Sequence, residues 1–317
     1  MESLSQIAQN IKDKDFFCIL THNYPDGDAV GSAVALCLAL QKLGKFAKVE
    51  FGANVPEKFS FLRSYIKNQD FEPKNYISVD LADTNLLHES LKFLSEKIDI
   101  CIDHHKSNKK YAKINFVDSF ASANCEVLFE LFEELGCIID ENIAKCLYVG
   151  IATDTGGFMY SNVRSQTHAI VSELLKRNID VSKINEQIFV LEPKKKFELK
   201  KLICNNLSFY FGDKVAISYI TLKEMSEIGI LDSELDGIAS IPVKIENVEI
   251  GVTIREKVDG FCKVSVRTRD IIDANEFCAI FDGGGHERAG GFNVPGDTSD
   301  AQKSIIEAIK KFTGWRE

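Results

Sequence analysis

Acidic and imidazole side chains gather at four places in the first half of this 317-residue chain. They lie in THNYPDGDAVGS (21–32), at the end of YISVD (76–80), directly after IDICI (98–102) and in GIATDTGG (150–157). The side chains are His22, Asp26, Asp28, Asp80, Asp103, His104, His105 and Asp154. Because carboxylates and imidazoles are ligands of divalent cations, the pattern predicts a metal site.

The number of these groups suggests more than one ion. Four of these carboxylates and two or three of the imidazoles already exceed what one hard cation needs, and they suit two divalent ions about 3.5–4 Å apart that share a carboxylate. The mixed ligand set favours Mn²⁺, with Mg²⁺ or Co²⁺ as substitutes, and the lack of cysteine ligands argues against a structural zinc site. Such a centre activates water for attack on phosphorus.

Three of the four groups follow short apolar runs that predict β-strands. The predicted strands are 16–21, 46–52, 75–83, 97–105 and 111–118, and the predicted helices are 28–44, 122–136 and 141–156. Near-continuous apolar strands between helices predict a parallel sheet with helices on both faces. Since such sheets bind ligands at the carboxyl ends of their strands, these groups should converge on one edge. Pro25 and Gly27 should bend the chain before a helix that begins near Ala29 and directs its N-terminus at the site.

The sequence pattern changes after about residue 185. EPKKKFELKK (192–201) is charged and predicts a helix, and the alternation beyond it, with turns at GDK and VDG, predicts a mixed or antiparallel sheet. We therefore predict an α/β protein with a catalytic domain (1–186), a helical linker (187–205) and a smaller α/β domain (206–317). The active site is expected in the cleft between the domains.

Composition narrows the possible partners. A net charge of −9 argues against coating of long nucleic acid but allows a short anionic substrate. We see no transmembrane run and no secretory signal, so a cytoplasmic protein is expected. The nine cysteines form no C-x-x-C pair and lie in apolar segments, which predicts buried, reduced thiols.

Together, the motifs resemble those of the DHH phosphoesterase superfamily over nearly the whole chain. HNYPDGDAVGS, VDLAD, IDHHK and ATDTGGF resemble its four N-terminal motifs, and VSVRTRD and FDGGGHERAGGF resemble the DHH-associated C-terminal domain. The resemblance implies metal ligands in two sets that share Asp80. The first set is His22 and Asp26, and the second is Asp28, His104 and Asp154.

The resemblance also implies roles for residues that are not ligands. His105 would contact the substrate or transition state, and Asp103 would orient a histidine. In the second domain, Arg267 and His286 would grip a phosphate that Gly283, Gly284 and Gly285 let the backbone approach. Arg269 should share a strand face with Arg267. One departure concerns SFASANCE, where Asn124 and Cys125 replace small hydroxyl residues, so a substrate contact from this loop is not expected.

Short two-domain members of the superfamily degrade oligoribonucleotides of a few residues and dephosphorylate 3′-phosphoadenosine 5′-phosphate (pAp). The resemblance thus implies short oligoribonucleotides or nucleotide bisphosphates as substrates. Alternatives are a phosphodiesterase for pApA or cyclic-di-AMP, a single-strand exonuclease, and a non-catalytic nucleotide-binding module. The apolar helix EVLFELFEEL (126–135) offers a face for a homodimer.

Overall fold

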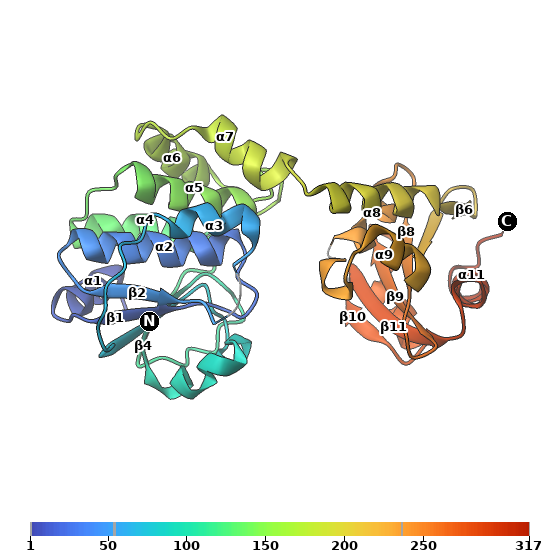
Figure 1. The fold of residues 1–317 in the computed structure, drawn as a ribbon, viewed down its shortest axis with the longest axis horizontal. Coiled ribbons are helices and arrows are strands. Elements are labelled where there is room, and N and C mark those ends of the chain that lie inside the picture. The colour runs from blue at the N-terminus through green and yellow to red at the C-terminus, as the bar shows by residue number, and fades with distance from the viewer. Residues whose placement is uncertain (1, 53–54, 236, 317) are drawn as a thin grey trace. The chain divides into compact units, whose positions relative to one another are not determined.

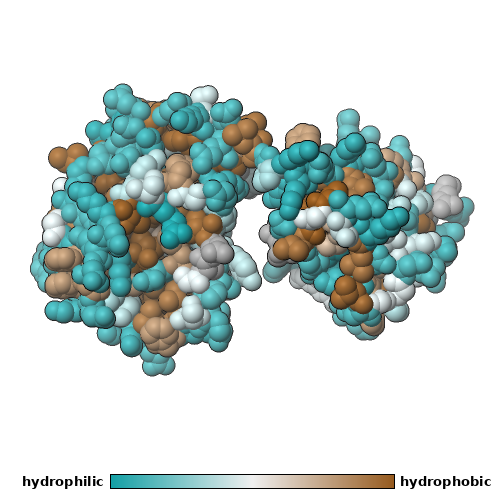
Figure 2. Space-filling model, in the orientation of Figure 1, coloured by the Kyte–Doolittle hydropathy of each residue, from teal (hydrophilic) through white to brown (hydrophobic). Residues whose placement is uncertain are grey.

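The computed structural model describes residues 2–52, 55–235 and 237–316. The chain forms two compact units, Met1–Leu191 and Glu192–Glu317 (Figure 1). The boundary falls inside the segment 187–205 that was predicted as a linker. Within the described residues, no helix has the length and apolar character needed to cross a membrane. Figure 2 shows mostly hydrophilic side chains on the viewed face, with hydrophobic ones interspersed.

The first unit contains the predicted parallel sheet. Its strands are β1 (Phe17–Leu20), β2 (Ala47–Glu50), β3 (Asn75–Val79), β4 (Ile98–Asp103) and β5 (Ile114–Val117). All neighbouring strands are parallel, in the order β2-β1-β3-β4-β5. The prediction of the sheet is therefore confirmed, and its strands end one to four residues before the predicted limits.

Helical segments cover both faces of this sheet, but they differ in kind. One face packs against α-helices through a core that includes Ile7, Val30, Leu128 and Leu147. The helices of this unit are α1 (Leu4–Lys12), α2 (Gly27–Lys42), α3 (Glu57–Arg63), α4 (Asn124–Leu135), α5 (Glu141–Asp154), α6 (Ser165–Leu175), α7 (Val181–Asn185) and the π-helical turn η3 (Glu186–Val190). The 3₁₀ helices η1 (Thr84–Leu86) and η2 (Glu89–Lys97) cover the other face.

The strand order creates a switch point between β1 and β3. The chain leaves β1 through α2 on one face, and it leaves β3 through η1 and η2 on the opposite face. Where connections diverge in this way, a crevice opens at the carboxyl ends of the two strands. His22 follows β1 and Asp80 follows β3, so both lie at this point.

Glycines bring α2 and α5 into close contact. A Cβ atom at Gly31 would lie 2.5 Å from the Cys146 carbonyl oxygen, and one at Gly150 would lie 2.3 Å from Cys125 Sγ and 2.6 Å from Asp28 Oδ1. Only glycine permits this approach. The packing places the start of α2, with Asp28, beside the end of α5.

The predicted start of α2 was wrong by two residues. The helix begins at Gly27 rather than near Ala29, because Asp26 is its N-cap. The Asp26 carboxylate oxygen Oδ1 accepts hydrogen bonds from the Asp28 and Ala29 N–H groups, each at 3.0 Å. Asp28 therefore belongs to the first helical turn.

The structure bears on two further expectations, the dimer face of α4 and the state of the cysteines. The apolar residues of α4, among them Val127, Leu131 and Phe132, are buried in the core, so they do not offer a dimer face. Homodimerisation stays a prediction without that support. All nine cysteines are free thiols, as predicted, and eight are buried. Cys204 is exposed, whereas its neighbour Ile203 is buried.

The second unit is built on a mixed sheet, as predicted. Its strands are β6 (Ser208–Tyr210), β7 (Val215–Ile220), β8 (Ile250–Glu256), β9 (Phe261–Thr268), β10 (Gly284–His286) and β11 (Ala289–Pro295). The order is β10-β11-β9-β8-β7-β6, and only the β7–β8 pair is parallel among the described strands.

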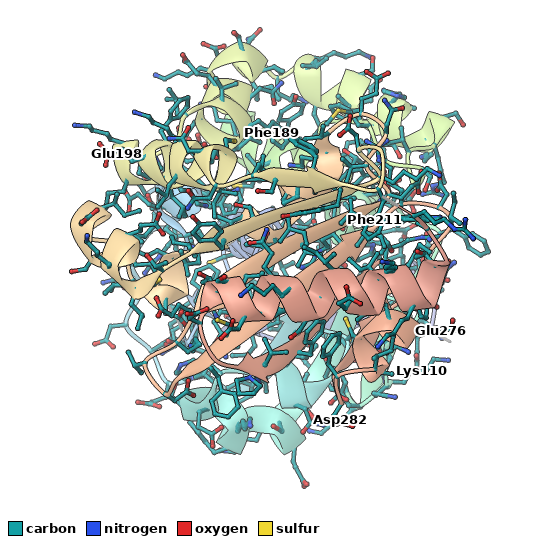
Figure 3. The ribbon with its side chains drawn as sticks, turned by 90° about the vertical axis from the view of Figure 1, so that its right-hand side faces the viewer. Lys110, Phe189, Glu198, Phe211, Glu276 and Asp282 are labelled. Atoms are coloured by element: carbon teal, nitrogen blue, oxygen red, sulfur yellow. The ribbon has the colours of Figure 1, made fainter. Side chains whose placement is uncertain are left out.

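Helices lie on both faces of the second sheet. One face carries α8 (Lys194–Asn205), α9 (Leu222–Ile228), η4 (Asp232–Glu234), η5 (Ile238–Ser240) and η6 (Pro242–Lys244). The other carries α10 (Ala274–Ala279) and α11 (Thr298–Thr313). Figure 3 shows α11 lying across the strands, with Glu276 of α10 and Asp282 before β10 labelled. The helix α8 packs on its own unit through Leu199 and Ile203.

The close packing of α2 and α5 yields a prediction. Gly150→Ala should destabilise the chain by about 1–3 kcal/mol, because its methyl group would overlap Cys125 and the Asp28 carboxylate. It should also weaken Mn²⁺ binding, as measured by calorimetry beside a thermal melt. The control is Gly229→Ala, which has φ +62° but open space, and which should cost about 1–2 kcal/mol through backbone strain alone and leave Mn²⁺ binding intact. Equal effects of the two variants on Mn²⁺ binding would contradict this account.

Candidate metal centre

The carboxyl edge of the first sheet brings six predicted ligands together. His22 and Asp80 follow β1 and β3, and His104 follows β4. The other three come from helix ends: Asp26 and Asp28 from the start of α2, and Asp154 from the end of α5. Residues up to 132 positions apart in the sequence thus meet at one place.

The ligand atoms form two neighbouring triads. His22, Asp26 and Asp80 make one triad, and Asp28, His104 and Asp154 make a second, with the ligand atoms of each within 4.8 Å of one another. His104 Nε2 lies 3.3 Å from Asp154 Oδ2, 3.5 Å from Asp80 Oδ1 and 3.8 Å from Asp28 Oδ2. His22 Nε2 lies 3.8 Å from Asp80 Oδ2. The two oxygens of Asp80 therefore face different histidines.

Two atoms at the middle of this cluster show that the site is suited to cations. Asp80 Oδ1 and His104 Nε2 are buried, yet neither has a hydrogen-bond partner among the described residues. An orphaned buried polar atom is costly unless something satisfies it. The donor set of carboxylate oxygens and imidazole nitrogens fits divalent cations. Asp80 would touch both ions, and each triad would hold one.

The charges of the cluster perturb one another strongly. Burial, reinforced by the neighbouring carboxylates, raises the pKa of Asp28 to about 7 and that of Asp154 to about 8. Burial also raises the pKa of Asp80 to about 6. For His104, burial disfavours the charged imidazole, but Asp80, Asp28 and Asp154 outweigh it and raise the pKa to about 10. The carboxylates repel one another and need positive charge between them.

Asp103 and His105, the two predicted site residues of the first unit that are not predicted ligands, contact each other. His105 Nδ1 lies 2.8 Å from Asp103 Oδ1, and this contact raises the pKa of His105. Asp103 is buried and also accepts hydrogen bonds from the His104 N–H at 2.8 Å and from Asn108 Nδ2 at 2.6 Å. Asp103 thus orients His105 and favours the protonated form of its imidazole.

The segment 121–126 includes Asn124 and Cys125, which differ from the family motif. Directly or through Asn162, it forms hydrogen bonds with three predicted ligands. The Asn124 and Cys125 N–H groups donate to Asp28 Oδ2 at 2.5 Å and Oδ1 at 3.0 Å. The Ala121 carbonyl oxygen lies 3.1 Å from His104 Nδ1, which directs Nε2 toward the acids. Asn162 Nδ2 donates to the carbonyl oxygens of Ser122 and Asp154, each at 3.1 Å. These contacts would help to orient the predicted ligands.

Asp80 has an unusual backbone conformation. Its φ is +52°, in the left-handed region, and its N–H donates to the Ile102 carbonyl oxygen at 3.1 Å. Asp is among the few residues besides Gly that adopt this conformation readily. The turn at the end of β3 therefore depends on the residue type that the site also requires.

The substrate residues predicted for the second domain also lie near one another. His286 on β10 is paired with Ala289 on β11, and Ala289 is paired with Arg267 on β9. Directly paired residues share a face, so His286 and Arg267 point to the same side of the sheet. Arg269 lies beyond the end of β9 and donates from NH2 to the Ile245 carbonyl oxygen at 3.1 Å.

The three glycines of this region have distinct surroundings. A Cβ atom at Gly283 or Gly285 would lie 2.4 or 2.2 Å from a carbonyl oxygen of β11, whereas Gly284 is open. The Gly283 N–H donates to the Cys278 carbonyl oxygen and the Gly285 N–H to Asn275 Oδ1, at 3.0 and 2.9 Å. Two of the three amides expected to approach a phosphate thus have partners within the protein.

The fold and the acidic edge define an α/β protein whose Asp and His side chains, gathered at the carboxyl ends of its strands, are suited to divalent cations. Residues 17–151 match the DHH family, N-terminal domain, and residues 212–314 match the DHHA1 domain. The chain is 31% identical, over 92% of its own length and 94% of the relative's, to the probable bifunctional oligoribonuclease and PAP phosphatase NrnA of Streptococcus mutans. The Thermus thermophilus bifunctional oligoribonuclease and PAP phosphatase NrnA is 27% identical, over 92% of this chain and 89% of that one.

A solved structure matches the chain closely as well. The exopolyphosphatase-related protein of Bacteroides fragilis superposes with a TM-score of 0.83 and 25% identity, over 98% of this chain and 96% of that chain. The chain belongs to the DHH family, and it is a phosphoester hydrolase.

Sequence reasoning missed the residues that position the ligands. Asn108, Ala121 and Asn162 act through a side-chain amide or a backbone carbonyl, and these have no motif of their own. The one available signal was the position of Asn108, five residues after the buried Asp103. Asn and Asp commonly fix turns by such local hydrogen bonds.

The perturbed pKa values predict that metal binding releases protons. Near pH 7, Asp154 and His104 are largely protonated and Asp28 is partly so, and cations must displace these protons. Since protons compete with the cation, Mn²⁺ affinity should rise with pH between about 6 and 8. Calorimetry at pH 7 in Pipes and in Tris, which differ in ionisation enthalpy, measures the release. Identical heats in the two buffers would contradict the prediction.

Proposed function

We propose that this protein hydrolyses short oligoribonucleotides to mononucleotides and converts pAp to AMP, with two divalent cations as cofactors. The observation that carries the proposal is the pair of neighbouring triads, of which the first includes Asp80 and the second includes His104, whose Nε2 lies 3.5 Å from Asp80 Oδ1. Relatives named as bifunctional oligoribonucleases and PAP phosphatases match 92% of this chain, which supports these two substrate types. The net charge of −9 suits short substrates, because long single strands need an extended basic groove.

The geometry and the family support the following ligand roles. His22 and Asp26 would hold one ion, Asp28, His104 and Asp154 would hold the other, and Asp80 would bridge them. When bound, two such cations lower the pKa of water and offset charge on the phosphoryl oxygens. We propose Mn²⁺, with Mg²⁺ or Co²⁺ as substitutes.

The side chains around the ligands supply the remaining functions. His105, whose pKa is raised by its contact with Asp103, would in its protonated form donate a hydrogen bond to a phosphoryl oxygen as negative charge develops there. Arg267 and His286 would hold a phosphate that is not cleaved. The active site between the two domains, a cytoplasmic location and a homodimer all stay predictions.

A substrate panel tests the proposal directly. With Mn²⁺, the protein should hydrolyse pAp and a five-nucleotide RNA, and products separated by length should end at mononucleotides. Cleavage of only pApA, only cyclic-di-AMP or only long single strands would favour the corresponding alternative. Binding without hydrolysis of any substrate would indicate a non-catalytic nucleotide-binding module.

Asp80→Asn tests the shared carboxylate. Asparagine tolerates the left-handed backbone, so the fold should persist, but the loss of the bridging charge should lower kcat by more than about 100-fold. Circular dichroism checks the fold and the panel above measures the rate. Wild-type activity in this variant would rule out the two-ion centre.

Arg267→Ala tests whether Arg267 holds a phosphate of the substrate. If Arg267 holds a phosphate equally in the ground and transition states, its loss should raise KM about tenfold and leave kcat nearly unchanged. The matched control is Arg269→Ala, since Arg269 donates to a backbone carbonyl oxygen beyond the strand. Similar KM values for the two variants would remove Arg267 from the site.

A further inference from the structure

A polar cavity lies on the second unit. It has a volume of about 180 Å³ and is bounded by residues of 232–239 and by the strands β8 and β9. The residues that matter chemically are Asp232, Thr253, Arg255, Lys263, Ser265 and Arg267. At about 30 Å³ per water molecule, the cavity has room for roughly six waters, or for a phosphate group with part of its sugar.

The strand register places this cavity next to Arg267 and His286, which are proposed to hold a phosphate. Thr253 is paired with Ser265 and Arg255 with Lys263 across β8 and β9. Because alternate residues of a strand share a face, Lys263, Ser265 and Arg267 all point to one side. His286 points to that side too, through the pairing of Ala289 with Arg267. Arg267 therefore lies between the glycine-rich strand and the cavity.

The cavity has an excess of positive charge. Its one described carboxylate, Asp232, is engaged by Arg255 at 3.1 Å and by Lys257 at 3.1 Å. Lys263 is exposed and forms no ion pair with any residue that the structure describes. Arg267 donates from NH1 to the Val266 carbonyl oxygen at 2.9 Å, which leaves other guanidinium N–H groups for a ligand. The lining thus favours an anion.

A buried hydroxyl in the cavity wall points to a ligand as well. Thr253 is 2% exposed, and its Oγ1 is buried without a hydrogen-bond partner among the described residues. Leaving a buried hydroxyl unsatisfied is unfavourable, and a ligand with hydrogen-bond acceptors would relieve the cost. Empty packing voids are lined by apolar groups, whereas this cavity carries two hydroxyls and four charged side chains.

We propose that this cavity binds a second uncleaved phosphate of an oligonucleotide, next to the one held by Arg267 and His286. The inference rests on the proposed function. Lys263 and Arg267 would supply the charge, and the hydroxyls of Thr253 and Ser265 would donate hydrogen bonds to the phosphate oxygens. A trinucleotide such as pApApA has two phosphates besides the cleaved one, whereas pAp has one. The cavity would therefore favour oligonucleotides over pAp.

Binding measurements on the full-length, metal-free protein test this subsite. Thr253→Val removes the hydroxyl at constant shape, and Lys263→Gln removes the charge. Each should weaken pApApA binding about threefold to tenfold in calorimetry and leave pAp binding unchanged. Thr253→Ser keeps the hydroxyl and should bind as wild type. Lys311→Gln, an exposed lysine on α11 over the opposite face, controls for net charge.

Several results would overturn the proposal. If the variants weaken the binding of pApApA and pAp equally, the cavity residues contact the same phosphate as Arg267. If the binding of pApApA is unchanged, the cavity is not a phosphate subsite. Wild-type protein that binds pApApA no more tightly than pAp, or an equal effect of Lys311→Gln, would also refute it. Because no hydrolysis is measured, failure of the proposed catalysis appears only in the substrate panel. Should Thr253→Val fold poorly in a thermal melt, the exposed Lys263→Gln still decides.

Discussion

Mutual repulsion among buried carboxylates is the constraint on which the rest of this structure depends. Asp28 and Asp80 are buried, and with Asp154 they face a single imidazole, His104, over 3.3–3.8 Å. Nothing in an unfolded chain would hold such groups together. The fold does so by delivering them from the ends of β1, β3 and β4 and from two helix termini. The N-terminal N–H groups of α4 further stabilise Asp28 through two hydrogen bonds.

The two units carry complementary chemistry. The first concentrates negative charge at one sheet edge, while the second collects Arg255, Lys263, Arg267 and His286 on one sheet face. The overall charge of −9 conceals this division. The acidic edge requires cations before it can bind an anion, whereas the basic face does not. Charge distribution, rather than net charge, is therefore the informative property of this chain.

The sequence predicted the acidic edge well because its signals are local. Short apolar runs ending in Asp or His gave the ends of β1, β3 and β4, and the sheet followed from their spacing. Asp26 was predicted as a ligand but not as a helix cap, so α2 was placed to begin two residues late. The 3₁₀ helices on the second face have no periodic signal of α-helical type. The hydrogen bonds of Asn124 and Cys125 to Asp28 were not predicted because they use backbone N–H groups. The cavity at Thr253 was not predicted because it depends on strand register, which only the folded chain establishes.

The left-handed backbone of Asp80 has a consequence for how this site could change over evolution. Most side chains disfavour that conformation by about 1–2 kcal/mol, so even Glu, which keeps the charge, would strain the turn after β3. Asn and Gly are the replacements that preserve the turn while discarding the bridging charge. A relative that has abandoned catalysis but kept the fold should therefore carry Asn or Gly at this position. One residue would then distinguish a working hydrolase from a descendant that only binds.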